Sequence, residues 1–271
     1  MASVPHGFED RGGVTVLTFP SLAEYPLAAV VTTRAGGVST GPYAELNLGL
    51  SVGDDPVAVV ANRERAAATI GLALDQLVFA NQVHGRGVAV VGDADRGRGA
   101  RRREGAVEAV DALVTRDPGV GLAILAADCA PILLYDPVTH AAAGVHSGWR
   151  GAVAGVAAAA VEALVVGGSC REDILAVHGP AVPRDRYQVG RDVADAAADA
   201  FGSSVGDVLQ PDGTGRWTFD LWRANERVLL RAGLRSERVG TVGLPTLGGT
   251  RFFSDRAERP CGRFALLVAL R

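Results

Sequence analysis

Three strongly apolar runs lie close together in the middle of the chain and set the first limit on its fold. They occupy residues 111–115, 121–137 and 141–151, with Pro131 and Pro137 as interruptions. Runs of this kind, which lack a polar residue at every second position, are typical of strands covered on both faces. The sequence therefore predicts buried strands that need other structure packed against them.

Shorter strand and helix patterns surround these runs. Further strands are predicted at 14–19, 28–33, 77–80, 88–91, 174–180, 239–244 and 263–270. Helices are predicted from Pro56, after a capping Asp55, in the Ala-rich stretch 151–168, and at 191–201 and 219–234. Strands and helices do not alternate regularly, no segment repeats, and no linker divides the chain. We therefore expect one compact α+β domain over residues 1–271, with mixed β-sheets sandwiched with helices.

The charged residues exclude several classes of function. All 27 basic residues are arginine, against 30 acidic residues, and the net charge is −3. The lack of lysine excludes Schiff-base catalysis, a P-loop lysine and pyridoxal attachment. The near balance of charge gives no general attraction to nucleic acid or to an anionic membrane. No Gly-x-Gly-x-x-Gly motif is present, so a Rossmann nucleotide site is unsupported as well.

The cysteines and the N-terminal region indicate a compartment. Cys129, Cys170 and Cys261 are odd in number and form no Cys-x-x-Cys pair, which suits a reducing environment. The first residues contain no apolar signal segment, and the stretch 151–168 is interrupted by Glu162 and barely reaches spanning length. We expect a cytoplasmic protein without membrane contact.

Residues 92–105 differ from the rest of the chain in composition. Five arginines fall between Arg96 and Arg103, without aromatic residues among them and with acidic residues on both sides. A basic run can bind nucleic acid, but this composition is more typical of a solvated loop. We expect a flexible Arg-rich loop at 92–105.

Three residues that can bind metals stand at predicted strand ends. His84 follows a strand, Cys129 lies in the sequence AADCAP, and His146 ends a strand just before a helix. Two imidazoles and one thiolate form a ligand set suited to zinc, with a fourth position left for water or substrate. The alternative is a free core cysteine with two hydrogen-bonded histidines, because the spacing matches no compact metal motif.

Seven motifs, in order along almost the whole chain, resemble one family. They are TTRAGGVSTGPYAELNLG, VGDDP with a downstream NR, NQVHG, ADCAPILLYDP, GVHSGWRG, YQVG and the terminal RFFSD…GRFALLVAL. Together they resemble the laccase-domain, or multicopper-polyphenol-oxidase-like, proteins. Bacterial members of this family are also named peptidoglycan editing factors and purine nucleoside phosphorylases.

The resemblance implies a metal, a substrate class and a fold. It implies a zinc ion held by His84, Cys129 and His146, and a mixed α/β sandwich. It also implies phosphorolysis of adenosine, inosine or methylthioadenosine, with deamination of adenosine. The partners would be a small-molecule nucleoside and phosphate. The chain departs from the family pattern at His178, Leu247 and Cys261, none of which is a proposed ligand.

Other polar residues in the motifs are candidates for the remaining roles. Guanidinium groups suit phosphate oxygens, so Arg34 in TTRAGG and Arg150 in GWRG are candidate phosphate ligands. Each can equally form a structural ion pair. Asp128 is a candidate general base or a support for a metal-bound histidine. The predicted catalytic residues are Asp128, Cys129 and His146; the predicted substrate and phosphate ligands are Arg34, Asn47, Gln82 and Arg150.

Two other activities use some of the same residues. A cysteine amidase acting on a peptidoglycan precursor would use Cys129 as nucleophile and His146 as base, without a metal. A multicopper oxidase needs about ten histidines. The chain has five, and its one methionine is Met1, so multicopper chemistry is excluded. A non-catalytic scaffold has no feature in its favour.

Overall fold

The apolar run at 121–137 forms two strands that belong to different sheets. The computed structural model describes all 271 residues, and in it β8 (Gly121–Ala126) lies in one sheet and β9 (Ala130–Asp136) in the other. The residues between them, 127–129, form the crossover from sheet to sheet. Cys129 therefore lies where the two sheets are joined by the chain.

One sheet has seven strands, in which β9 pairs antiparallel with both of its neighbours. From edge to edge it contains β1 (Ala2–Ser3), β15 (Val239–Thr241), β11 (Leu175–His178), β9, β10 (Ala141–Ser147), β7 (Ala112–Thr115) and β6 (Val88–Val90). The parallel pairs lie toward its two edges, where β1 and β11 flank β15 and β6 pairs with β7.

The second sheet has six strands and is antiparallel except at one edge. It contains β2 (Gly7–Arg11), β3 (Val14–Thr18), β4 (Leu27–Thr32), β16 (Phe264–Leu270), β8 and β5 (Leu77–Phe79). The parallel pair is β5 with β8. The β2–β3 hairpin was predicted only in its second strand, because β2 carries charged residues on exposed positions.

The two sheets pack face to face, and side chains alternate along each strand to build the layers. In β16, Phe264, Leu266 and Val268 enter the core between the sheets, where they meet Leu133 and Tyr135 of β9. The residues between them pack on the opposite face, toward the helix α1 (Pro56–Ala68). This alternation follows from the period of two in a strand. The mixed α+β sandwich expected from the sequence is confirmed.

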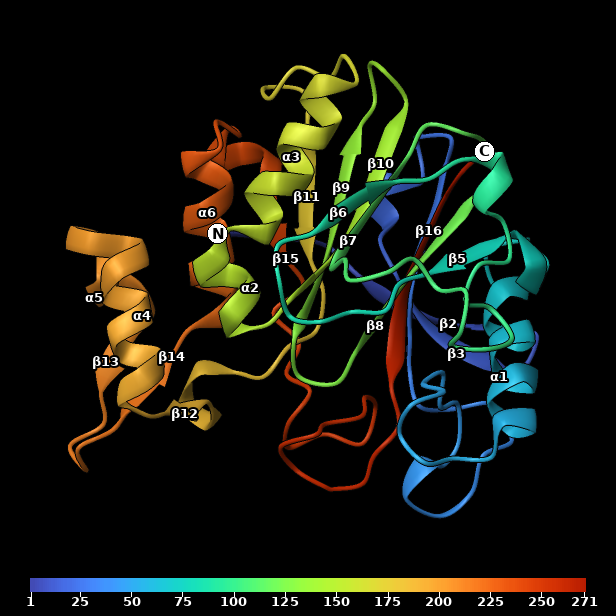
Figure 1. Cartoon of the computed structure of the whole chain (residues 1–271), viewed down its shortest axis with the longest axis horizontal. Helices are drawn as coiled ribbons and strands as arrows, with labels where there is room; N and C mark the ends of the chain where they lie inside the picture. Colours follow the sequence, from blue (N-terminus) through green and yellow to red (C-terminus); the bar gives the residue numbers. More distant parts are fainter.

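Helices cover both outer faces of the sandwich (Figure 1). The six-stranded sheet is covered by α1, whose capping residue Asp55 accepts a hydrogen bond from the Val57 amide as predicted. The seven-stranded sheet is covered by the other helices, through the largest apolar core. These are α2 (Trp149–Ala154), α3 (Val156–Val166), α4 (Arg191–Phe201), α5 (Val205–Val208) and α6 (Leu221–Arg231).

The Ala-rich stretch 151–168 forms parts of two helices, although one helix was expected. The break is at Gly155, whose φ of 79° is left-handed and therefore ends α2 before α3 begins.

No helix has both the length and the apolar character needed to cross a bilayer.

Smaller elements complete the fold. A third sheet contains β12 (Gln188–Val189), β14 (Trp217–Phe219) and β13 (Leu209–Pro211). Single 3₁₀ turns occur at Pro20–Leu22, Gly41–Tyr43, Leu74–Gln76, Asp93–Asp95, Arg184–Arg186, Gly202–Ser204 and Ser236–Arg238.

Residues 92–105, expected as a solvated flexible loop, are bonded to the body of the molecule. The Gly97 amide donates to the Leu77 carbonyl at 3.1 Å, and Arg63 of α1 donates to the carbonyl oxygens of Gly99 and Ala100. Ala100 is buried. The loop therefore forms a wall between α1 and the edge of the six-stranded sheet.

Candidate metal centre and cavity

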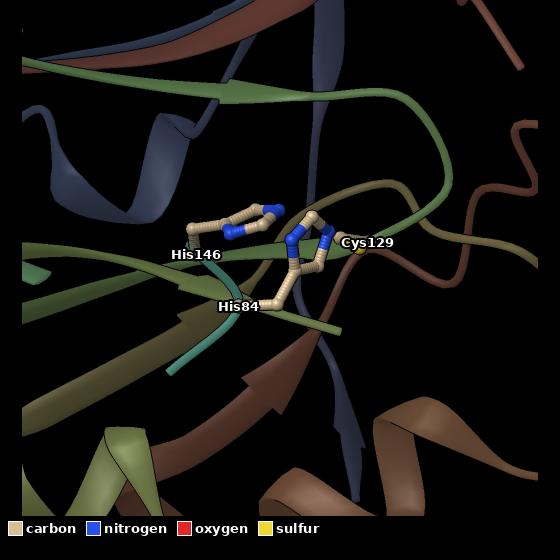
Figure 2. A group of neighbouring side chains, drawn as sticks. All are labelled: His84, Cys129 and His146. Atoms are coloured by element: carbon tan, nitrogen blue, oxygen red, sulfur yellow. The ribbon is translucent and has the colours of Figure 1, made fainter. Parts of the chain in front are cut away.

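His84, Cys129 and His146 lie together although they are far apart in the sequence. His84 follows β5, Cys129 lies in the crossover, and His146 is near the end of β10. One ligand atom from each of the three lies within 4.8 Å of the others. Figure 2 shows the side chains converging on one point. The sequence hypothesis that these three residues share a site thus agrees with the geometry.

Asp111 positions two of the three side chains, and it was not singled out in the sequence. Its carboxylate accepts a hydrogen bond from Nδ1 of His146 at 2.8 Å. It also accepts the backbone amides of Val83, His84 and Gly85 at 3.2, 2.9 and 2.7 Å. A carboxylate bonded to one nitrogen of a histidine leaves the other nitrogen free for a metal. The only sequence signal was an aspartate at the start of the apolar strand β7.

Gly148 gives the three ligands the space to approach one another. A Cβ on this residue would lie 2.7 Å from Sγ of Cys129 and 3.3 Å from Cδ2 of His84. Its φ is −86°, which other residues also adopt, so the requirement for glycine is steric. A larger residue would push the thiolate and the imidazole apart.

Cys129 and His146 shift each other's protonation. Burial raises the pKa of the Cys129 thiol, but the charge of His146 and hydrogen bonds from both histidines outweigh burial and lower this pKa to about 6. Burial lowers the pKa of His146, but the Cys129 thiolate and Asp111 raise it to about 9. The thiolate is the form that binds metals, and a metal would replace the proton of His146.

A cavity of about 430 Å³ opens over the three ligands. Its walls come from α1, the Arg-rich loop, β8 and the segment before β16. The hydroxyl of Tyr187 has no hydrogen-bond partner, and Tyr187 lines the cavity. Burial raises the pKa of Tyr187, so its phenol stays protonated and can donate to a ligand. The volume falls in the range of small-molecule sites.

Of the four predicted substrate and phosphate ligands, only Gln82 lines this cavity. Gln82 exchanges two hydrogen bonds with the backbone of Leu125 in β8, at 2.8 and 2.9 Å. Asn47 is completely buried and bonds to the backbone of Gly49 and Arg263. The role of Asn47 in this structure is therefore to fix loops.

The two predicted phosphate arginines lie outside the cavity. Arg34 donates to Glu258 at 2.8 Å and packs over the ring of Phe253. Arg150 is exposed and stacks on Trp149, with its guanidinium carbon 4.4 Å from the ring centroid. For Arg34 the structure supports the ion-pair interpretation, because its guanidinium contacts the Glu258 carboxylate. This partner is 224 residues away in the sequence, so no local pattern revealed it.

Asp128 lines the cavity. The sequence suggested it as a support for a ligand histidine, but in the structure it bonds to neither His84 nor His146. Its carboxylate accepts hydrogen bonds from the hydroxyls of Thr246 and Ser254, at 2.6 and 2.7 Å, and from the Arg256 amide at 2.7 Å. Its φ of 86° turns the side chain toward this segment. Asp111 provides the histidine support instead, and Asp128 fixes the segment 246–256 beside Cys129.

Five arginines line the cavity, none of which was predicted as a ligand. They are Arg63, Arg103, Arg256, Arg259 and Arg263.

His178, where the chain departs from the family pattern, belongs to the core and not to the cavity. It is completely buried in β11, and Nδ1 lies 3.0 Å from the Gly240 carbonyl. Nε2 has no partner. Burial lowers the pKa of His178 to about 4, so the ring is neutral.

The comparisons with known proteins agree on one family. Residues 28–271 match the family described as multi-copper polyphenol oxidoreductase laccase. The chain belongs to this family. The laccase-family chain is 42% identical over 247 residues to "Purine nucleoside phosphorylase ORF3" of Streptomyces griseus, covering 88% of this chain and 92% of that protein. It is 35% identical over 243 residues to "Purine nucleoside phosphorylase YlmD" of Bacillus subtilis, covering 89% and 87%.

Solved structures of the laccase family share the whole fold. The crystal structure of YlmD from Geobacillus stearothermophilus has a TM-score of 0.92 at 34% identity, covering 98% of this chain and 100% of that chain. The hypothetical protein YfiH of Bacillus licheniformis also has a TM-score of 0.92, at 32% identity, with 97% and 99% covered.

The copper in the family's description does not fit this chain. Only two of its five histidines belong to the metal-ligating group, and His178 lies in the core. A trinuclear cluster with a separate blue-copper site needs about ten histidines. The residues present fit one metal ion, because they supply two imidazoles and one thiolate that lie close together. Asp111 orients the two histidines, and Gly148 leaves space for Cys129 and His84.

Proposed function

We propose that the chain is a zinc-dependent purine nucleoside phosphorylase that also deaminates adenosine, and that it acts in the cytoplasm. The observation that carries the proposal is the convergence of His84, Cys129 and His146 at a cavity large enough for a nucleoside. The names of relatives at about 42% identity support the phosphorylase activity. The donor set supports zinc as the metal.

The three ligand residues would hold the zinc ion, and a bound zinc ion supplies Lewis acidity. The chain's own groups then bind and orient the substrate. The Tyr187 phenol donates a hydrogen bond into the cavity, and the wall of β8 and Gln82 limits how a flat base can enter. Asp111 keeps the proton on Nδ1 of His146, since its carboxylate accepts from that atom.

Two reactions are proposed for the same cavity. In phosphorolysis, a phosphate oxygen bonds to C1′ of the ribose while the bond from C1′ to the purine breaks. The purine leaves with the bonding electrons and takes up the proton that the phosphate or water releases. The sugar becomes ribose 1-phosphate, or 5-methylthioribose 1-phosphate when the substrate is methylthioadenosine. In deamination, water adds at C6 of adenine and ammonia leaves, giving inosine. Binding sites for both reactants make the first reaction effectively unimolecular.

The test combines a substrate screen with elemental analysis of the same sample. We expect about one zinc per chain in protein purified without added metal. Ribose 1-phosphate should form from adenosine or inosine, and 5-methylthioribose 1-phosphate from methylthioadenosine, only when phosphate is present. Inosine should form from adenosine without phosphate. Cys129→Ala and His146→Ala should each lose metal and both activities while the circular-dichroism spectrum stays unchanged. Copper alone, or no metal, would contradict the zinc assignment.

A second candidate is a cysteine amidase that acts on a peptidoglycan precursor. The observation in its favour is the Cys129–His146 pair, in which the thiol has a pKa of about 6 and the imidazole one of about 9. Such an amidase would keep its activity in a chelator and lose it on alkylation of Cys129. The phosphorylase, by contrast, would lose its activity in the chelator.

A further inference from the structure

Arg63 is a buried cation without a carboxylate partner. Its side chain belongs to α1, and the residue is 3% exposed. Nε donates to the Leu48 carbonyl at 2.8 Å, and Nη1 donates to the carbonyls of Gly99 and Ala100 at 2.7 and 2.8 Å. Buried charges in proteins are normally paired with an opposite charge. Arg63 has only these neutral oxygens, so its charge is not neutralised within the chain.

One nitrogen of Arg63 remains available to a ligand. Nη2 makes no hydrogen bond, and Arg63 lines the cavity over the metal-ligand group. The guanidinium stacks on Phe79, with its carbon 3.9 Å from the ring centroid, so its orientation is fixed. Burial lowers the pKa of Arg63 to about 9, and the side chain is still charged at neutral pH.

Arg103 and Arg256 add two further unneutralised charges to the same cavity. Arg103 donates to the amide oxygen of Asn81, and Arg256 donates to the Gln188 carbonyl. Neither forms an ion pair, whereas Arg259 and Arg263 both pair with Asp255. The second cavity carboxylate, Asp128, accepts only from hydroxyls and a backbone amide. Arg63, Arg103 and Arg256 therefore leave the cavity with an excess of positive charge.

Asp128 ties the backbone of Arg256 to the segment that carries Cys129. The Arg256 amide donates to its carboxylate at 2.7 Å, and Asp128 directly precedes Cys129. Arg103 lies in the loop whose backbone is held by Arg63. Arg63 and the loop of Arg103 are thus held together, and the backbone of Arg256 is held to the crossover.

We propose that Arg63, Arg103 and Arg256 form an anion subsite for a phosphate group in the cavity over the metal ligands. Guanidinium groups match phosphate oxygens in geometry and charge. The ligand is orthophosphate as the attacking reactant, or the phosphate group of ribose 1-phosphate in the reverse direction. This inference rests on the proposed phosphorylase function, and it places the subsite at residues other than Arg34 and Arg150.

The test measures binding of inorganic phosphate and of ribose 1-phosphate by isothermal titration calorimetry, with the metal-loaded protein. Arg103→Ala, Arg256→Ala and Arg63→Met are compared with two matched controls. Arg102→Ala changes an exposed arginine of the same loop that has no side-chain partner, and Arg65→Met changes an exposed arginine of the same helix. Neither control residue lines the cavity.

We expect each of the three variants to weaken phosphate binding at least tenfold, while the controls stay within twofold of the parent protein. The KM for phosphate in phosphorolysis should rise by a similar factor, and deamination of adenosine, which needs no phosphate, should keep its rate. If Arg63→Met does not fold, Arg103→Ala, Arg256→Ala and their combination still decide the outcome. Weaker binding of ribose 1-phosphate alone would assign the subsite to the sugar phosphate.

Two results separate this inference from the proposed function. Phosphorolysis with unchanged phosphate affinity in Arg103→Ala, Arg256→Ala and their combination would overturn the subsite and leave the phosphorylase assignment intact. Phosphate binding that is lost in these variants, in a protein that phosphorolyses no purine nucleoside, would support the subsite and overturn the phosphorylase assignment.

Discussion

The carboxylate of Asp111 lies 2.8 Å from Nδ1 of His146 and at the same time accepts the amide of His84 at 2.9 Å. One side chain therefore orients two of the three residues that could hold a metal ion. His84 has a φ of 60°, an uncommon conformation for a histidine, and the hydrogen bonds from its own amide and from the Val83 and Gly85 amides hold it there.

Asp111→Asn should reduce zinc affinity about 10- to 100-fold. The asparagine has an oxygen on only one side, so its NH₂ group would face either the imidazole N–H or backbone amides that need an acceptor. Competition with a chromophoric chelator measures the affinity. The control is Asp136→Asn, which changes a buried aspartate that accepts from Thr139 at the far end of β9. Equal zinc affinity in both variants would contradict the role of Asp111.

Gly148→Ala should lower zinc content without unfolding the protein. The added Cβ would lie 2.7 Å from Sγ of Cys129, closer than a van der Waals contact, and the thiolate would have to move. The matched control is Gly206→Ala, where a Cβ meets nothing within 4 Å. Zinc per chain and the thermal midpoint are measured for both variants. Full zinc occupancy in Gly148→Ala would show that the ligand group has more room than this geometry allows.

The buried His178 should make the protein sensitive to acid. Its pKa of about 4 in the folded state lies below the ordinary value near 6.5, so the unfolded chain binds the proton more tightly. The stability that depends on its neutral form is complete above pH 6.5 and is lost as the pH falls toward 4. From pH 7 to pH 5, the parent protein should lose about 2 kcal/mol more of its unfolding free energy than His178→Asn. Urea denaturation at both pH values measures the difference, and equal losses would refute this role.

Tyr187→Phe should lower kcat/KM for the nucleoside about five- to tenfold, which corresponds to the loss of one hydrogen bond of roughly 1 kcal/mol. The phenol lines the cavity and makes no hydrogen bond within the protein. Zinc content should stay at the parent level, because Tyr187 is not a metal ligand. Tyr25→Phe, which removes a hydroxyl outside the cavity, should leave the kinetics unchanged. If both variants keep the parent value, Tyr187 does not donate to the substrate.

The predicted strand ends singled out His84, Cys129 and His146 in the sequence, and the resemblance to the laccase-domain family then joined them as one ligand set. In the structure β5 ends five residues before His84, β8 ends three residues before Cys129, and His146 is the penultimate residue of β10. Side chains that follow anchored strands lie at the rim of the sheets. The fold class followed from the same strands. The run 121–137 contains two strands that lie in different sheets, with the left-handed Asp128 between them. The sequence does not reveal this division, because both strands are apolar.

The arginines show why the rest of the site could not be predicted. Arg34 stands in a glycine-rich motif, yet it pairs with Glu258 near the other end of the chain. Arg63 stands in an ordinary helical pattern, and it is buried because the loop carrying Gly99 and Ala100 packs over it. Whether an arginine is neutralised depends on partners that are distant in sequence, and neither residue type nor spacing reveals them.

The crossover at 127–129 makes the metal centre sensitive to the alignment of the whole sandwich. His84 follows the edge strand of the six-stranded sheet, His146 belongs to the seven-stranded sheet, and Cys129 lies on the connection between them. A small displacement of one sheet relative to the other would therefore separate the three side chains that could hold a metal ion. Leu133 is buried between the sheets and does not line the cavity. Leu133→Ala should therefore weaken metal retention only by changing how the two sheets pack against each other.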